Sequence, residues 1–401
     1  MEAILSSVRP MTLGKQSTLI VEDILNLAYD YTQKNNAEWG LILAATFDLL
    51  VSSEYYQSMT HRGWTYCSEE PTLLLYPFTN TCPRCLSKGK FVFANGNKPE
   101  SGRIGTITLE ILCAILQHAF KKKGNSAIVY KASEPVDVII HDPISDSILL
   151  AEVKAAPLLT LPISVSCDRQ TEMVGGNTVS AGHSLSDNPF FKESELSIFF
   201  PQTEKHKERT YGVHVDWTGA DPFLHAICDV IRDNGSFFGH YYGYWCEAFD
   251  AYGKRARDVP SFWLTNGCGQ PVPRPDTWPS RRGSGYESVS DGKTSVGMDR
   301  TDDIKKGTYQ VLKLGSEFKP SSKRQVRTAL ISNVHAVRHY GEYLLPIHNV
   351  VWAVCESTEV QTAGDLDSET AVYNLFDGII SFTKCDIRDK WLSALFDFGR
   401  E

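Results

Sequence analysis

One stretch of twenty residues constrains the fold of this chain more than any other. It runs from Pro135 to Lys154 and reads PVDVIIHDPISDSILLAEVK. Two short apolar runs, Val136–Ile140 and Ile148–Val153, flank the turn-forming cluster Asp142–Asp146. β-branched runs bounded by Asp, Pro and Ser are typical of strands joined by a turn. The sequence therefore predicts an antiparallel hairpin.

The pairing of the hairpin brings charged residues together. A symmetric turn pairs Asp142 with Ser147, and counting outward from this pair places Asp137 opposite Glu152. Side chains alternate between faces of a strand, so Lys154 shares the face of Glu152. Charges do not gather on an apolar hairpin without compensation. Two carboxylates and an ammonium can hold a divalent cation beside an attacked phosphate, whereas a surface hairpin with a cross-strand ion pair is the alternative.

This arrangement resembles the motif of the PD-(D/E)XK nucleases, with Asp137 as first acid, Glu152 as second acid and Lys154 as the lysine. Pro135 stands two positions before Asp137 instead of directly before it. The resemblance implies an α/β (α+β) fold with a restriction-endonuclease-like core, in which helices flank a mixed central sheet. It also implies Mg²⁺ held by Asp137, Glu152 and the backbone carbonyl of Val153, with Lys154 positioning or activating a water molecule.

The segments before the hairpin fit the same resemblance. Thr106–Lys121 has apolar residues at helical spacing and predicts a helix, and Ala127–Lys131 predicts a short strand. A helix followed by three antiparallel strands resembles the way the core of this nuclease family begins. In some members a glutamate on that helix joins the metal site, which makes Glu110 a candidate here. A solvated helix glutamate is the alternative.

The remainder of the core is expected further along the chain. Lys323–Tyr343 has an amphipathic pattern and predicts a helix, and the apolar run Asn349–Cys355 predicts a buried strand. A helix followed by a buried strand is what the nuclease core needs after its third strand. The predicted core is therefore split into residues 105–157 and 305–356, with an insertion at 165–300.

The predicted domain organisation has three parts. Residues 1–60 contain two segments of helical periodicity and predict a helical N-terminal unit. Residues 61–100 form a candidate zinc-binding segment, and residues 101–401 form the predicted nuclease domain.

The candidate zinc site centres on the CPRC sequence that begins at Cys82 and ends at Cys85. Two cysteines at this spacing on a tight turn can bind one Zn²⁺. Cys67 is the candidate third ligand, and His61 is the nearest candidate for the fourth. More remote candidates for the fourth position are Cys113 and His118. A turn with free thiols is the alternative, and no thioredoxin-like βαβ pattern supports a redox role.

DNA contacts are expected outside the core, because catalytic groups carry no sequence information. The insertion offers arginines beside aromatic residues, although a solvated loop is the alternative. The candidate base-reading residues of the insertion are Arg274, Arg281 and Arg282. The zinc segment offers rival basic residues that also suit backbone clamping: Arg84, Lys88 and Lys90.

Composition restricts the functional classes. The chain has 401 residues and a net charge of −8, which argues against a nonspecific nucleic-acid coating protein but allows a local basic cleft. Its ten cysteines lie among apolar residues, which suits reduced thiols. The N-terminal sequence lacks the pattern of a signal peptide, so a cytoplasmic protein without membrane association is expected.

These features together predict a type II restriction endonuclease, that is, a site-specific, Mg²⁺-dependent hydrolase of double-stranded DNA. Neither a nucleotide-binding loop nor a Gly-rich fingerprint after a strand is present in the sequence. Such enzymes often act as homodimers on palindromic sites. A DNA methyltransferase is expected in the same system, though not as a bound partner. The alternatives are a zinc-dependent DNA-binding protein without catalysis, and a repair or transposition nuclease of the same fold.

Overall fold

The computed structural model describes most of the chain. The described residues are 8–10, 15–58, 65–66, 69–70, 73–75, 81–90, 92, 101–166, 195–266, 296–355, 360 and 362–399. The chain divides into two compact units. Unit 1 consists of Met1–Met11, Leu112–Ala155 and Gly297–Glu401, and unit 2 consists of Thr12–Ile111 and Ala156–Val296.

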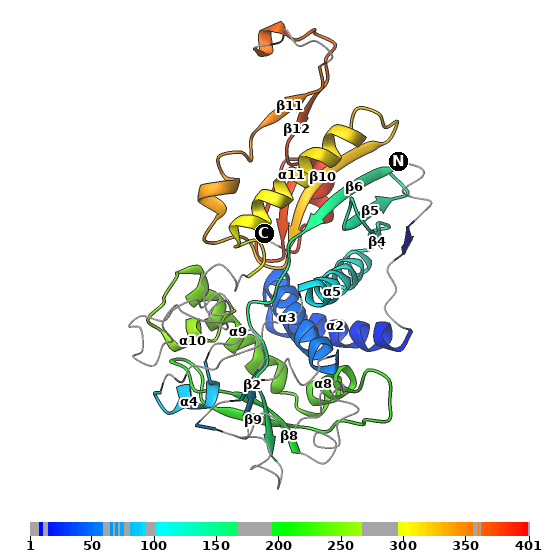
Figure 1. Cartoon of the computed structure of the whole chain (residues 1–401). Helices are drawn as coiled ribbons and strands as arrows, with labels where there is room; N and C mark the ends of the chain where they lie inside the picture. The colour runs from blue at the N-terminus through cyan, green and yellow to red at the C-terminus, as the bar shows by residue number, and fades with distance from the viewer. Residues whose placement is uncertain are drawn as a thin grey trace. The chain divides into compact units, whose positions relative to one another are not determined.

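Unit 1 is built on a mixed sheet, shown with its labels in Figure 1. Its strands lie in the order β1-β4-β5-β6-β10-β13-β14. The first four of these neighbours are antiparallel, β10 is parallel to both β6 and β13, and β14 returns antiparallel. The strands are β1 (Arg9–Pro10), β4 (Ile128–Lys131), β5 (Val138–Asp142), β6 (Ser147–Val153), β10 (Gln325–Ser332), β13 (Gly378–Ser381) and β14 (Cys385–Ile387). The predicted class, a mixed central sheet flanked by helices, is confirmed.

The predicted hairpin is the β5–β6 pair, and its register is confirmed. Asp142 pairs with Ser147, and Val138 pairs with Ala151. The Asp142 carboxylate fixes the turn, since it accepts hydrogen bonds from the Ile144 amide at 3.0 Å and the Ser145 hydroxyl at 2.6 Å. The next position outward from the Val138 pair places Asp137 beside Glu152.

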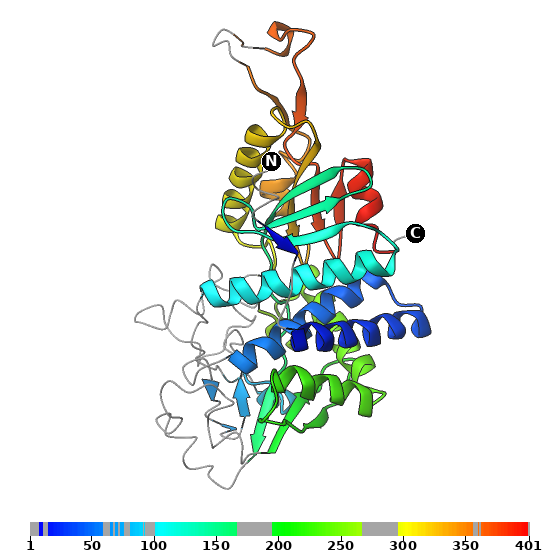
Figure 2. The same cartoon turned by 90° about the vertical axis from the view of Figure 1, so that its right-hand side faces the viewer.

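Helices cover both faces of this sheet, as Figure 2 shows. On one face lies α11 (Thr301–Phe318), and on the other lies α12 (Lys390–Leu395). The C-terminal part of α5 (Ser101–Lys122) belongs to unit 1, and its Phe120 ring packs edge-on against Phe396 with centroids 5.5 Å apart. The sheet is thus buried on both sides, which suits the continuous apolar runs in β6 and β10.

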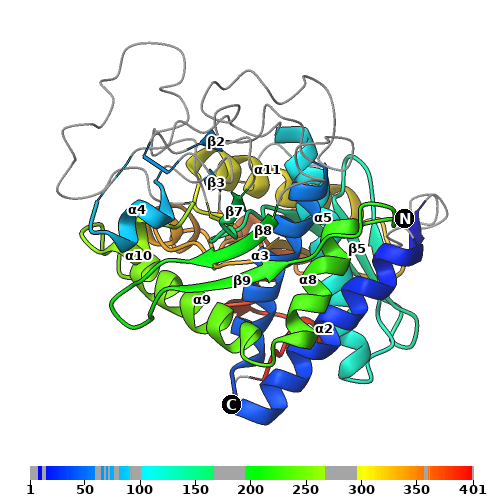
Figure 3. The ribbon, with the colours of Figure 1, turned by 90° about the horizontal axis from the view of Figure 1, so that it is seen from below.

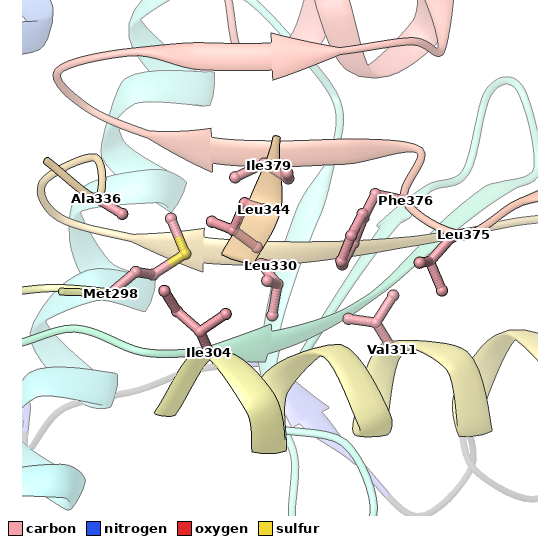
Figure 4. Packing of buried hydrophobic residues seen from close by; sticks show 9 residues of the cluster. All are labelled: Met298, Ile304, Val311, Leu330, Ala336, Leu344, Leu375, Phe376 and Ile379. Carbon is pink, nitrogen blue, oxygen red and sulfur yellow. The ribbon is translucent and has the colours of Figure 1, made fainter. Parts of the chain in front are cut away.

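The face covered by α11 holds the core that positions the site. Ile148 and Leu150 of β6 pack with Leu314 and Phe318 of α11. Nearer the start of α11, Ile304 and Val311 pack with residues of β10, β13 and the loops around them (Figure 4). The labelled side chains are Met298, Ile304, Val311, Leu330, Ala336, Leu344, Leu375, Phe376 and Ile379. α11 therefore runs antiparallel to β6 and β10, with its C-terminal end near the amino ends of these strands.

Two predictions of secondary structure in the second core segment are wrong. The predicted helix at Lys323–Tyr343 is instead β10, a loop and a single π-helical turn, η4 (Tyr340–Leu344). The predicted buried strand at Asn349–Cys355 contains only β11 (Val351–Ala353), which pairs with β12 (Val372–Asn374) in a separate ribbon, and Val351 is 51% exposed. The core helix and strand that follow the hairpin are α11 and β10, so the helix begins four residues before the predicted segment 305–356.

Unit 2 combines a helical group with an antiparallel sheet, seen from below in Figure 3. Its longer helices are α2 (Lys15–Asn35), α3 (Trp39–Ser58), α8 (Pro222–Asp233) and α9 (Phe237–Gly253). Its sheet has the order β2 (Thr65–Tyr66), β3 (Leu73–Leu75), β7 (Ile163–Ser166), β8 (Glu195–Phe200) and β9 (Arg209–Val213). The helices of the predicted N-terminal unit 1–60 and the described part of the predicted insertion 165–300 both fall almost entirely in this unit.

A buried carboxylate organises the centre of unit 2. Asp48 on α3 accepts hydrogen bonds from the amides of Leu158 and Leu159 at 3.0 and 2.9 Å. The Trp245 indole of α9 donates to the same oxygen at 2.7 Å. Three donors compensate this buried charge, which explains how an aspartate can interrupt an otherwise apolar helix.

The length and composition of Ile104–Lys122 in α5 would suffice to cross a membrane. Of that stretch, 56% is buried inside the protein, and core helices also reach this length and hydropathy.

Candidate active site

Three charged side chains meet where β6 ends. Asp137 directly precedes β5, Glu152 is the penultimate residue of β6, and Lys154 directly follows it. The Lys154 amide donates to the carbonyl of Ile331 on β10 at 2.9 Å, so the backbone here is held between two neighbours in the sheet. The group lies at the carboxyl ends of parallel strands, the edge at which ligands commonly bind in α/β sheets.

Hydrogen bonds hold the three groups against one another. Asp137 Oδ2 accepts from the Val153 amide at 2.8 Å, and the Asp137 carboxylate is close enough to Glu152 to raise its pKa. Lys154 Nζ donates to Glu152 Oε1 and lies 3.4 Å from the Val153 carbonyl oxygen. The sequence-predicted set Asp137, Glu152, Val153 and Lys154 is therefore brought together around one point.

The charge of this group is incompletely compensated. Glu152 is 7% exposed. Its pKa is raised to about 7, first by burial and then by the nearby Asp137 carboxylate, while Lys154 offsets part of both effects. A second cation beside the two carboxylates would favour the ionised form of Glu152.

The residues present fit a hard divalent cation. Mg²⁺ prefers oxygen ligands and usually takes one or two carboxylates while keeping several waters. Asp137, Glu152 and the Val153 carbonyl supply such a set. Among the described residues, no group of three or more His, Cys, Asp or Glu side chains could hold a metal, but a site of two carboxylates and a carbonyl contains only two such side chains.

A glycine of α11 closes the site from the helix side. A Cβ atom at Gly307 would lie 2.8 Å from Leu330 Cδ2, 3.8 Å from Lys154 Cγ and 3.9 Å from Glu152 Cγ. The missing side chain lets the helix backbone approach the aliphatic parts of Glu152 and Lys154. Sequence reasoning missed Gly307, because the helix that contains it was not predicted.

The remaining candidate for the predicted Mg²⁺ site, Glu110, lies on α5 in the part of the helix that belongs to unit 2. The other site residues belong to unit 1, so a role for Glu110 in the metal site stays a prediction.

The CPRC segment is the N-cap and first turn of the short helix α4 (Pro83–Ser87). Cys82 and Cys85 are both buried, and the Cys85 carbonyl accepts hydrogen bonds from the amides of Lys88 and Lys90 at 3.0 and 2.9 Å. The other candidate ligands, Cys67 and His61, lie outside the described residues. The remote candidates Cys113 and His118 belong to unit 1, whereas the CPRC turn belongs to unit 2. The zinc site stays a prediction.

The candidate DNA-reading residues divide in the same way. Arg274, Arg281 and Arg282 lie outside the described residues. Arg84 stacks over the Phe199 ring at 4.6 Å and donates to the Ser164 hydroxyl at 3.4 Å, and Lys88 is paired with Glu70. Arg84 and Lys88 of the candidate zinc segment thus have partners within unit 2.

A second acid–lysine pair lies on the same face of the unit 1 sheet, and sequence reasoning missed it. Glu152 pairs with Leu330, Leu330 with Ile379, and Ile379 with Asp386, so these four residues form one row across the strands. Lys384 lies two positions from Asp386, as Lys154 does from Glu152. In the sequence, only the spacing of Lys384 and Asp386 points to this pair, and that spacing is common by chance. The strand register is needed to recognise it.

Comparisons of the chain with protein-family models, with curated protein sequences and with solved structures gave no match. The roles of Asp137, Glu152 and Lys154 therefore rest on the sequence motif and on their own geometry and chemistry.

Proposed function

We propose that this chain is a Mg²⁺-dependent nuclease of the PD-(D/E)XK type that hydrolyses phosphodiester bonds of double-stranded DNA. The observation that carries the proposal is the meeting of Asp137, Glu152 and Lys154 at the carboxyl end of β6. The buried Glu152 and the partly buried Asp137 are poorly compensated by one lysine, and with the Val153 carbonyl they offer oxygen ligands to a divalent cation.

Each residue has a distinct part in the proposed chemistry. Asp137, held by the Val153 amide, and Glu152 bind the cation together with the Val153 carbonyl. When bound, Mg²⁺ offsets negative charge on the scissile phosphodiester and lowers the pKa of water. The Lys154 ammonium, fixed by Glu152, orients the attacking water and places a positive charge beside the phosphate.

The order of elements around the site supports the proposal. α5 precedes the antiparallel strands β4, β5 and β6, and α11 and β10 follow them. β10 lies parallel to β6 at its other edge. This is the helix, three strands, helix and strand that the resemblance to the nuclease family implies.

The finer statements of the proposal concern the biological role. A type II restriction endonuclease is the preferred role, acting as a homodimer beside a cognate DNA methyltransferase. Structural Zn²⁺ at Cys82 and Cys85 belongs to the same proposal. Elemental analysis of protein prepared in metal-free buffer should find zinc, and the Cys82→Ser/Cys85→Ser variant should lose it.

Cleavage of supercoiled plasmid DNA tests the proposal. The protein should nick or linearise plasmid with Mg²⁺ present and leave it intact with a chelator. Discrete fragments from long DNA would favour a restriction enzyme over a repair or transposition nuclease. Asp137→Asn and Glu152→Gln should each abolish cutting, whereas Lys313→Ala, a change at an exposed lysine on α11, should not. DNA binding without cutting in any divalent metal would favour the non-catalytic DNA-binding alternative.

A further inference from the structure

The π-helical turn η4 carries two tyrosines that each face a lysine from another element. Lys384, in the turn between β13 and β14, places its Nζ atom 4.5 Å from the ring centroid of Tyr340. Lys305 of α11 places its Nζ atom 5.7 Å from the ring centroid of Tyr343. A lysine over an aromatic face is attracted by the ring, which restricts its otherwise flexible side chain. Single π-helical turns occur frequently at functional sites.

Lys384 is held in place while its ammonium group remains open. Its side chain is 48% exposed, and Nζ lies 3.7 Å from Asp386 Oδ2. That carboxylate oxygen already accepts a hydrogen bond from the Tyr340 hydroxyl at 2.5 Å. Within the described part of the chain, no hydrogen bond engages the Lys384 ammonium. Its three N–H donors are thus available to a ligand.

This behaviour differs from that of the other lysines beside carboxylates in the unit. Lys154 donates to Glu152, and Lys319 is 4% exposed and bonded to Asp377 at 2.7 Å. Lys384 and Lys305 instead keep their charge at the surface. Glu342 is the exposed acid of the same turn, and it lies 3.6 Å from His339 Nδ1.

Both lysines belong to the same unit as the candidate active site. Lys305 is exposed on α11 two residues before Gly307, and it lies on a different face of the helix from the one that meets Lys154 and Glu152. Lys384 lies at the same end of the sheet as Lys154. Ser332, which is beside Lys154, pairs with Ser381, and the Ser381 amide donates to the Lys384 carbonyl. Three strand spacings separate Lys154 from Lys384, a distance of roughly 14 Å. That span corresponds to about four nucleotides along one DNA strand.

We propose that Lys305 and Lys384, held over Tyr343 and Tyr340, bind backbone phosphates of the nucleic acid on which the site acts. This inference rests on the proposed nuclease function. A lysine ammonium binds phosphate as a point charge and reads no bases, so the two contacts position the duplex and leave sequence selection to other parts of the chain. Asp386 and the two tyrosine rings keep the lysines oriented towards the ligand.

The salt dependence of DNA binding tests the inference directly. The background is the Glu152→Gln full-length protein, which should bind without cutting, and the probe is a short duplex of random sequence. Lys305→Ala/Lys384→Ala in this background should lower the slope of log K against log salt by about 2 between about 50 and 200 mM. Affinity near 0.1 M salt should fall by about ten- to one-hundredfold.

A matched variant controls for net charge. Lys313→Ala/Lys323→Ala removes two exposed lysines, one in the middle of α11 and one before β10. It should change the slope by much less than one unit. Thermal unfolding of both double variants should match that of the parent, since all four side chains are exposed or half-exposed.

Each outcome decides the inference. Equal slopes for the two double variants, with the parent binding the duplex, would overturn the phosphate contacts and leave the proposed nuclease intact. A uniform loss of affinity without a change in slope would also overturn them. A parent that neither binds the duplex nor, as wild type, cuts plasmid would overturn the contacts together with the proposed function.

Discussion

Two lysine–carboxylate pairs lie at opposite ends of α11, and their surroundings differ. At the C-terminal end, Lys319 is bonded to Asp377 at 2.7 Å and to the Asn374 carbonyl at 2.9 Å. The Thr328 amide donates to the same Asp377 oxygen at 2.7 Å. At the other end, Lys154 is bonded to Glu152, but Glu152 also faces the carboxyl group of Asp137.

The difference separates a structural ion pair from a candidate site. Every contact named around Asp377 brings a donor, so the charge is compensated and the loop before β13 is fixed to the end of α11. Glu152 instead faces a second acid, Asp137. Burial, and after it the charge of Asp137, raise the pKa of Glu152 to about 7. Incompletely compensated carboxylates at the ends of strands are costly, and such perturbed groups cluster at functional sites.

Replacing the two lysines should give the largest contrast. Lys154→Met should reduce plasmid cleavage by at least about a hundredfold, because the charge beside the phosphate is lost. Stability near neutral pH should change little, since Glu152 can take up a proton. The measurement is the initial nicking rate at saturating Mg²⁺, and a rate near that of the wild type would remove Lys154 from the proposed chemistry.

Lys319→Met should act in the opposite way. Removing one partner of a buried pair leaves an uncompensated charge at Asp377 and costs about 3–5 kcal/mol of unfolding free energy. Denaturant unfolding measures this loss. The nicking rate of the remaining folded protein, assayed well below the midpoint, should stay within severalfold of wild type, and a rate loss equal to that of Lys154→Met would erase the contrast between the pairs.

The pH dependence of stability gives an effect of similar size at Glu152. Its pKa is about 7 in the folded protein against an ordinary value of 4.5, so protonation favours the folded state. The stabilisation is fully present below pH 4.5 and is lost as the pH rises through 7, by about 3 kcal/mol in total. Glu152→Gln remains uncharged, so its stability relative to wild type should rise between pH 4.5 and 7 and level off above. A difference that is independent of pH would show that burial beside Asp137 does not control Glu152.

The smallest contrast comes from the two glycines of α11 that face the sheet. A Cβ at Gly315 would lie 3.0 Å from the Trp352 ring, whereas a Cβ at Gly307 would clash with Leu330 Cδ2 at 2.8 Å and make ordinary contact with Lys154 Cγ at 3.8 Å. Each change to alanine should raise the free energy of unfolding by up to about 1 kcal/mol through helix propensity, and crowding should offset part of this gain. Only Gly307→Ala should lower the nicking rate, by severalfold, because Leu330, which pairs with Glu152, has to shift. Equal rates for the two variants would contradict a positioning role for Gly307.

The hairpin could be predicted because its information is local. The turn from Asp142 to Asp146 is specified by residues that hydrogen-bond within it, and the strand period of two then fixes which residues face each other. Asp137 and Glu152 therefore fell opposite each other without any knowledge of the rest of the sheet.

The second half of the core could not be predicted, because its pattern depends on distant neighbours. β10 is covered on both faces and lies between two parallel strands, so Val326, Leu330 and Val334 matched a helical spacing by coincidence. α11 carries Gly307 and Gly315 at positions where the sheet comes close, and glycines weaken a helical pattern. The apolar run at β11 was predicted as buried, but it belongs to an exposed ribbon.

Binding of Mg²⁺ to the metal-free protein, measured by calorimetry, tests the central proposal most directly. At pH 8 we expect one Mg²⁺ to bind per chain through Asp137 and Glu152. Binding should be absent in Asp137→Asn and unchanged in Lys305→Ala/Lys384→Ala. Below pH 7 its apparent affinity should weaken by about tenfold per pH unit, because the cation competes with the proton on Glu152. No binding at pH 8, or binding that neither Asp137→Asn nor Glu152→Gln changes, would contradict the account.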